Sequence, residues 1–257
     1  MSRTVGFGGG MPFPPVVKWL VITNVAIWFV GQVVLEGFIL RSNLVSGYLS
    51  LVPLQVLEQG FLWQLVTYMF LHTSQVTHIL FNMLMLWFFG AELEMRWGRK
   101  FFATYYFVTG VGAAIIYVAG TALAAGLFNV GVFTLAIPVQ GASGAIFGLL
   151  LAYGMLFGER VIHFMMIFPM KAKFFVLIMG FVEFASLLSS RERGSEVAYL
   201  AHLGGIVSGF VFLKGWGWWQ RRQWNKKAAQ KHRGRNLRLV VDNDKEEDDK
   251  NGPRYWN

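Results

Sequence analysis

Residues 138–150 read PVQGASGAIFGLL and lie within residues 101–158, a stretch of 58 positions without Asp, Glu, Lys or Arg. A water-soluble domain rarely runs so far without a charge, because much of its surface is polar. The stretch therefore predicts a chain embedded in a membrane, with Ser143 at membrane depth. A polar side chain at that depth is costly, so Ser143 is a candidate functional residue.

The composition agrees with a membrane protein. Hydrophobic residues make up 55% of the chain, charged residues 14%, and the mean hydropathy is +0.47. The absence of cysteine excludes disulfides, thiolate zinc sites and Cys nucleophiles. The net charge of +9 is concentrated in a basic run at residues 221–238, which the acidic segment DNDKEEDD follows. This arrangement favours a tail beside anionic lipid headgroups over a nucleic-acid-binding surface.

About 20 apolar residues are needed for a helix that crosses a bilayer. Six segments meet this need, at about residues 16–38, 75–93, 101–124, 141–158, 171–189 and 198–218. We expect an all-α, six-helix membrane domain over residues 16–218, after a short cytoplasmic leader (1–15) and before a charged cytoplasmic tail (219–257).

Lys and Arg lie mainly in three places: the connection between the second and third predicted spans, the connection between the fourth and fifth, and the tail. The positive-inside rule then places both termini in the cytoplasm. The connection between the first and second predicted spans is long, at about 35 residues, yet it is rich in Leu, Trp, Tyr and Phe. It predicts short amphipathic helices lying in the outer interface.

Polar residues recur near the outer ends of the second, fourth and sixth predicted spans. His78 and Asn82 are four positions apart and share a helix face. Ser143 opens the fourth span and His202 the sixth. The helical rise puts all four at similar depth, about 5–10 Å below the outer surface.

Small residues repeat at intervals of four on the fourth and sixth spans, a spacing that allows helices to pack closely in lipid. The two stripes are Gly144, Gly148 and Ala152, and Ala201, Gly205 and Gly209. If these stripes face each other, Ser143 and His202 come within hydrogen-bond distance, ~3 Å.

These segments resemble the rhomboid family of intramembrane serine proteases. The matching motifs are HILFN (78–82), GASG (141–144), AHLGGIVSG (201–209) and ELEMRWG (92–98). They occur in the order and topology of that family over roughly residues 16–215. The resemblance implies a six-helix membrane bundle whose site opens to the outer side of a cell membrane, here a bacterial inner membrane.

The resemblance also implies roles for individual residues. Ser143 is expected to be the nucleophile and His202 its general base, while His78, Asn82 and the Ser143 backbone N–H line the oxyanion hole. The supporting positions are Gly141, Gly144, Phe147, Gly205, Gly209, Glu94 and Arg96. Since no carboxylate stands beside these motifs in the sequence, a Ser-His dyad is predicted, with no metal or organic cofactor.

Two positions depart from the common family pattern. Phe147 stands where many members have a tyrosine that packs on the histidine, and Trp63-Gln64 stands where Trp-Arg is usual. Glu183 is an acid inside the fifth predicted span. It is expected to have either a functional role or a structural role between helices. Glu94 and Arg96 are expected to form a structural pair, and His72 to cap the outer connection.

The sequence thus predicts an endopeptidase that cuts other transmembrane proteins near the outer ends of their helices. The partners are these substrates and the lipid bilayer; the oligomeric state stays open. One alternative is a non-catalytic rhomboid-like factor that binds membrane proteins without cutting them. A more distant one is a transporter or channel, although no internal repeat supports it.

Overall fold

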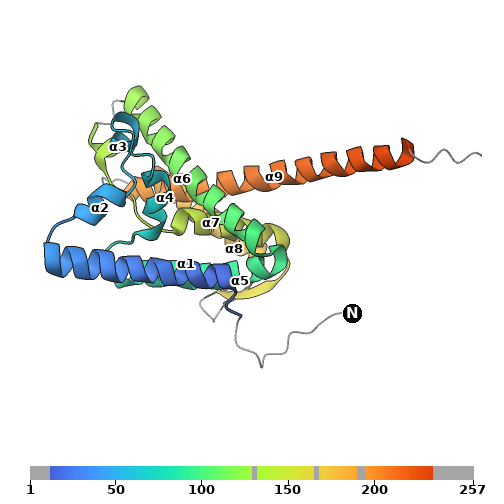
Figure 1. Ribbon diagram of the computed structural model, residues 1–257, viewed down its shortest axis with the longest axis horizontal. Coiled ribbons are helices and arrows are strands. Elements are labelled where there is room, and N and C mark those ends of the chain that lie inside the picture. Colours follow the sequence, from blue (N-terminus) through green and yellow to red (C-terminus); the bar gives the residue numbers. More distant parts are fainter. Residues whose placement is uncertain (1–11, 129–131, 165–167, 190–194, 234–257) are drawn as a thin grey trace, which may run out of the picture. The chain divides into compact units, whose positions relative to one another are not determined.

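The computed structural model describes residues 12–128, 132–164, 168–189 and 195–233, and the chain divides into two compact units, Met1–Gly215 and Trp216–Asn257. In chain order the elements are α1 (Pro15–Ala26), the π-helical η1 (Ile27–Leu40), α2 (Leu44–Leu49), α3 (Pro53–Glu58), α4 (Gln64–Thr67), the 3₁₀ turn η2 (Tyr68–Phe70), α5 (Val76–Trp97), α6 (Arg99–Phe128), the 3₁₀ segment η3 (Val132–Ala136), α7 (Ser143–Leu156), β1 (Val161–Phe164), β2 (Phe168–Lys171), α8 (Ala172–Ser189) and α9 (Ser195–Arg233). Figure 1 shows the same order by colour.

A helix occupies each of the six segments that the hydropathy singles out. Within the described residues, Pro15–Leu40, Val76–Trp97 and Arg99–Leu127 are long and apolar enough to cross a membrane. Helix α7 is apolar but has only 14 residues, and it ends at Leu156 rather than near residue 158. Six crossings therefore stay a prediction, whereas the predominantly helical fold is observed.

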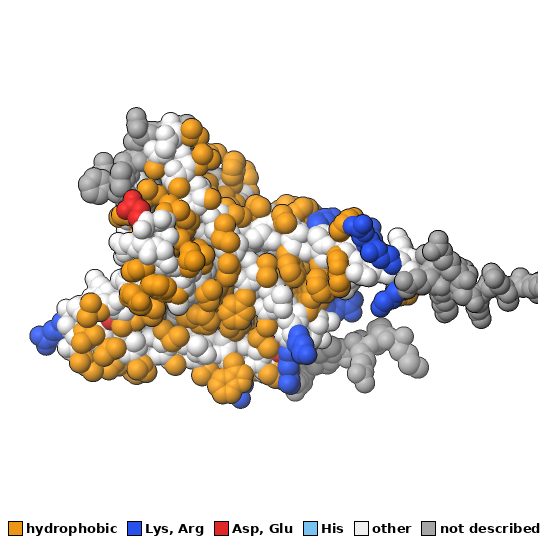
Figure 2. Space-filling model, turned by 45° about the horizontal axis from the view of Figure 1, so that its top comes forward, with side chains coloured by type: hydrophobic (Ala, Val, Ile, Leu, Met, Phe, Trp, Pro, Cys, Tyr) orange, Lys and Arg blue, Asp and Glu red, His pale blue; other side chains and the backbone are white. Residues whose placement is uncertain are grey.

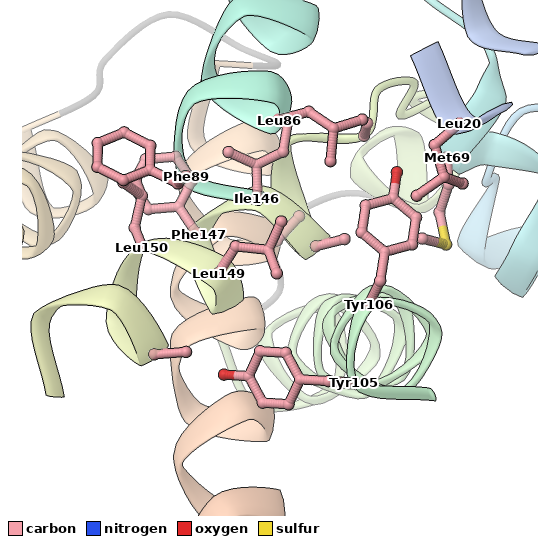
Figure 3. Packing of buried hydrophobic residues seen from close by; sticks show 14 of the residues in the cluster. Leu20, Met69, Leu86, Phe89, Tyr105, Tyr106, Ile146, Phe147, Leu149 and Leu150 are labelled. Atoms are coloured by element: carbon pink, nitrogen blue, oxygen red, sulfur yellow. The ribbon is translucent and has the colours of Figure 1, made fainter. Parts of the chain in front are cut away.

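Helix α7 lies at the centre of the first unit. It packs against α5, α6 and α8, and most of its side chains are buried. A helix that is apolar on all sides belongs in such a position. Figure 3 shows the surrounding core, in which the labelled residues include Leu86 and Phe89 from α5, Tyr105 and Tyr106 from α6, and Ile146, Phe147, Leu149 and Leu150 from α7.

Large apolar side chains remain exposed on the outer faces of the helices. On α8, Leu177, Phe181 and Leu188 share one face and are each about two-thirds exposed or more. Figure 2 shows hydrophobic side chains over much of the visible face of the first unit. In water such a surface would be unfavourable, but lipid tails solvate it without cost.

Short helices form the connection between η1 and α5, as the sequence predicts; their location in a membrane interface stays a prediction. Gln64, which replaces the usual arginine, is fully buried. Its side chain accepts a hydrogen bond from the Val52 N–H (3.0 Å) and donates to the Tyr48 carbonyl (3.2 Å) and the Gln55 amide oxygen (2.6 Å). Gln64 thereby links the parts of this connection, so the departure from the family pattern leaves it well bonded.

The connection between α7 and α8 contains structure that the sequence analysis did not predict. Strands β1 and β2 pair as an antiparallel two-stranded sheet, with His163 opposite Pro169. Glu159 forms ion pairs with Lys171 and Lys173 beside this sheet. The segment is a connection, as expected, rather than a further span.

The predicted pairing of Glu94 with Arg96 is wrong. Glu94 is buried, and its two carboxylate oxygens accept hydrogen bonds from the backbone N–H groups of Val16 (3.0 Å) and Val17 (2.8 Å). Arg96 is exposed. Residues two apart on a helix point in different directions, which explains why the two side chains separate.

Glu94 instead caps the start of α1. The first N–H groups of any helix lack partners within the helix, and their positive end favours an anion. The carboxylate satisfies two of them and fixes α1 beside α5, where the two helices lie side by side in Figure 1.

Replacing Glu94 with Gln is expected to lower the free energy of unfolding by about 1–3 kcal/mol. The neutral amide offers one acceptor oxygen in place of two, so one buried N–H loses its partner. Thermal unfolding of the purified protein in detergent measures the effect. Glu58→Gln, an exposed acid at the end of α3, is the matched control; equal unfolding temperatures for the two variants would contradict the capping role.

Candidate active site

Ser143 is the first residue of α7, and a tight turn precedes it. Gly141 has φ +133°, a conformation that L side chains rarely adopt, and its N–H donates to the Tyr68 carbonyl (3.0 Å). A Cβ at this glycine would lie 3.2 Å from His78 Nε2 and 3.4 Å from Ser143 Oγ. The missing side chain therefore leaves open the space between the hydroxyl and the imidazole of His78.

The structure brings Ser143 and His202 together. Ser143 Oγ lies 2.8 Å from His202 Nε2, although the two residues are 59 positions apart. The Phe147 ring, one turn further along α7, stacks on the imidazole at 4.4 Å between centroids and 18° between planes. A phenyl ring thus packs on the histidine without the hydroxyl of the usual tyrosine.

His78 lies beside Gly141, and its hydrogen bonds indicate its tautomer. The Thr73 backbone N–H donates to Nδ1 (3.3 Å), and the Thr73 hydroxyl lies 3.1 Å from the same nitrogen. A nitrogen that accepts a hydrogen bond carries no proton, so in the neutral ring the proton is on Nε2. That N–H is on the side of Gly141 and Ser143, where it is able to donate to a bound group.

Asn82 is buried one turn below His78. Its amide nitrogen donates to the His78 carbonyl (2.8 Å), and its amide oxygen is a buried atom for which the described residues provide no partner. The amide has a second N–H hydrogen that this bond does not use. Asn82 therefore holds the start of α5 and retains donor capacity.

His72 is completely buried beside His78, with 5.2 Å between ring centroids. Burial, with a smaller contribution from His78, lowers the pKa of His72 to about 3, which keeps this ring neutral. Its backbone N–H donates to Gln32 Oε1 (2.8 Å), which fastens the end of the outer connection to η1.

No carboxylate stands beside these motifs in the sequence, but the structure places one next to His202. Glu183 Oε2, on α8, lies 2.8 Å from His202 Nδ1. Both side chains are largely buried: 10% of the Glu183 side chain and 16% of the His202 side chain are exposed. The sequence carried a signal, a lone acid in an apolar helix, but nothing in the spacing indicated which residue it contacts.

The small-residue stripes of α7 and α9 face each other only in part. A Cβ at Gly205 would lie 1.9 Å from the Gly144 carbonyl oxygen, which shows direct backbone contact. Further along, Gly148 and Gly209 face α6 instead. The Tyr105 hydroxyl lies between them and donates to the Gly148 carbonyl (2.8 Å). The backbone contact of α7 with α9 at Gly144 and Gly205 is therefore close in sequence to Ser143 and His202.

These features define a class of protein before any comparison. Long apolar helices, outward-facing apolar side chains and a half-buried Ser-His pair indicate a multi-pass membrane protein with a hydrolase-like site. Within the part of the chain that the structure describes, no group of three His, Asp or Glu side chains is placed to hold a metal ion.

Comparisons with known proteins identify the family. The family model of the rhomboid domain matches residues 59–218. The putative rhomboid protease YdcA of Bacillus subtilis is 30% identical over 214 residues, which cover 81% of this chain and 92% of that protein. The chain therefore belongs to the rhomboid family.

Two further relatives are similar over a smaller share of their length. RHOMBOID-like protein 12, mitochondrial, of Arabidopsis thaliana is 26% identical over 203 residues, which cover 77% of this chain and 57% of that protein. Rhomboid protease GlpG of Serratia proteamaculans is 30% identical over 150 residues, which cover 58% of this chain and 46% of that protein. Family membership and these protease names together support an intramembrane protease.

Proposed function

We propose that the chain is an intramembrane serine endopeptidase, with Ser143 as nucleophile and His202 as general base. The observation that carries the proposal is the 2.8 Å separation between Ser143 Oγ and His202 Nε2. A serine hydroxyl attacks poorly until a base removes its proton, and an imidazole at hydrogen-bond distance is such a base.

In the first half of the reaction, Ser143 Oγ forms a bond to the carbonyl carbon of the scissile peptide while its proton passes to His202 Nε2. The tetrahedral intermediate collapses as His202 returns that proton to the leaving amine nitrogen. Water then hydrolyses the acyl-enzyme by the same proton transfers, and Ser143 is regenerated.

Negative charge on the former carbonyl oxygen needs hydrogen-bond donors in place before it develops, and losing one donor costs about 10²–10³ in rate. The Nε2–H of His78 is the best-placed side-chain donor, since it borders the open space at Gly141. Ser143 is the first residue of α7, where a helix leaves its backbone N–H groups without intrahelical partners, so its N–H is proposed as a second donor. Asn82 is proposed as a further donor through its second amide hydrogen.

The proposed substrates are transmembrane segments of other membrane proteins, because the site belongs to a chain embedded in lipid. A helical peptide bond is shielded by its own backbone, so the substrate must unwind locally to reach Ser143. The proposed topology keeps both termini in the cytoplasm, residues 16–218 as the membrane domain and the site open to the outer side.

A fluorophosphonate probe tests the activated hydroxyl without knowledge of a natural substrate. We expect labelling of the purified protein in detergent, with the modified peptide mapping to Ser143. Ser143→Ala should lose the label, whereas Thr104→Ala, which removes an exposed hydroxyl on α6, should retain it.

The two rivals predict different outcomes in related assays. A non-catalytic binding member would capture a transmembrane peptide but leave both the probe and the peptide intact. A channel or transporter would show flux in liposomes that survives Ser143→Ala. Failure of the probe to modify Ser143 in folded protein would sink the proposed nucleophile.

A further inference from the structure

Glu183 is an unusual residue for its position. It lies in α8, whose sequence AKFFVLIMGFVEFASLLS contains no other acid, and the residue as a whole, backbone included, is 8% exposed. A carboxylate in such a helix is expensive unless a partner compensates it. The compensating contact is the 2.8 Å hydrogen bond to His202 Nδ1.

Both nitrogens of His202 are therefore occupied, Nε2 by Ser143 Oγ and Nδ1 by Glu183 Oε2. In neutral imidazole one nitrogen donates and the other accepts. An ionised carboxylate only accepts, so it requires the proton on Nδ1. Nε2 is then the acceptor, which is the state that a general base for Ser143 needs.

We infer that Glu183 is a positioning residue that acts through His202, so that Ser143, His202 and Glu183 work as a three-membered relay rather than a dyad. The inference rests on the proposed function. When the Ser143 proton moves to Nε2, His202 becomes an imidazolium. The carboxylate stabilises that cation while remaining ionised itself, and the proton later leaves from Nε2 to the amine.

The competing explanation is structural. A protonated Glu183 that donates to Nδ1 would also fasten α8 to α9, but it would hold the opposite tautomer, with Nε2–H directed at Ser143. Replacing Glu183 with glutamine distinguishes the structural role from the relay. It resembles the protonated acid in shape and hydrogen bonding, so a structural role predicts near-normal activity for Glu183→Gln, whereas the relay predicts a large loss.

The experiment compares wild type, Glu183→Gln and Glu183→Asp with a fluorescent transmembrane peptide in detergent. For Glu183→Gln we expect kcat to fall ~10²–10⁴-fold with little change in KM, since the residue contacts the base rather than the substrate. Glu183→Asp retains the charge and is expected to recover part of this loss. Glu92→Gln is the control, because Glu92 bonds Tyr153 and Arg160 instead of the site.

The pH profile provides a readout that packing alone does not change. The charged or titratable groups that face His202 are Ser143 from α7, Glu183 from α8 and, by electrostatic interaction, His78 from α5. Glu183→Gln removes a negative charge that lies 2.8 Å from the base, and this charge favours the imidazolium. The acidic fall of kcat/KM should therefore shift to lower pH in Glu183→Gln and remain in place in Glu92→Gln.

A Glu183→Gln enzyme with wild-type kcat and an unshifted profile would overturn the relay. If Glu183→Gln unfolds, the comparison of Glu183→Asp with Glu183→Ala decides. A folded Glu183→Asp enzyme that is much more active than Glu183→Ala supports a role for the negative charge, and equal activities oppose it. The fluorophosphonate probe tests the proposed nucleophile independently of the relay. Labelling of Ser143 in wild type upholds the nucleophile even if the relay fails.

Discussion

Replacing Ser143 with alanine is expected to reduce peptide cleavage about 10⁴–10⁶-fold. The variant keeps the helix and its packing but has no oxygen to attack the carbonyl carbon. His202→Ala is expected to cause a similar loss, because the serine then keeps its proton. The measurement is cleavage of a fluorescent transmembrane peptide by protein with a normal unfolding temperature.

The two losses should not add. Ser143 and His202 share one proton transfer across 2.8 Å, so removing either abolishes the step. The double variant should therefore be no slower than either single variant. Thr104→Ala serves as the control for loss of a hydroxyl elsewhere. Residual cleavage near the wild-type rate in either single variant would refute the catalytic pair.

Gly205→Ala is expected to disrupt the site from a distance. An added Cβ would lie 1.9 Å from the Gly144 carbonyl oxygen, and this neighbour is backbone, which cannot rotate away. Helices α7 and α9 must separate to accept the methyl group. We expect a loss of stability at least as large as the ~1–3 kcal/mol typical of an overpacked core. Activity should fall as well, because Ser143 and His202 are carried by these same two helices.

Gly215→Ala is the matched control on the same helix. A Cβ there would meet nothing within 4 Å, and alanine favours helix over glycine by roughly 1 kcal/mol. This variant should be neutral or slightly more stable in thermal unfolding. If Gly205→Ala behaved in the same way and kept full activity, the close contact of α7 with α9 would not be what holds the site together.

The motifs made much of the site predictable. His78, Ser143 and His202 each stand out because a polar side chain in an apolar helix is costly, and helix direction and rise predict a common depth for them. The small residues at Gly144 and Gly205 also indicated close packing. The same spacing also suggests contact between α7 and α9 at Gly148 and Gly209, but there both glycines face Tyr105 or Thr109 of α6. A repeat of four describes the surface of one helix and does not reveal which neighbour packs against it.

The errors share one cause. The sequence predicts a pair of Glu94 with Arg96, two positions away, but Glu94 accepts hydrogen bonds from the start of α1, 77 and 78 positions away. Glu183 had no assigned partner, although His202 lies only 19 positions further along. The sequence marks Glu183 as a costly acid in an apolar helix and marks Glu94 only as one member of a pair. In both cases the contact that compensates the carboxylate depends on how separate helices pack.

By itself, the sequence determined that this chain is a helical membrane protein with rhomboid motifs, because hydropathy, helix periodicity and motif spacing are properties of consecutive residues. The tertiary structure alone decided that Glu183 reaches the second nitrogen of His202, that α7 and α9 touch at Gly144 and Gly205, and that Glu94 caps α1. Such contacts join side chains across helix interfaces, and their partners are set by rotation and tilt of whole helices, which no local pattern encodes.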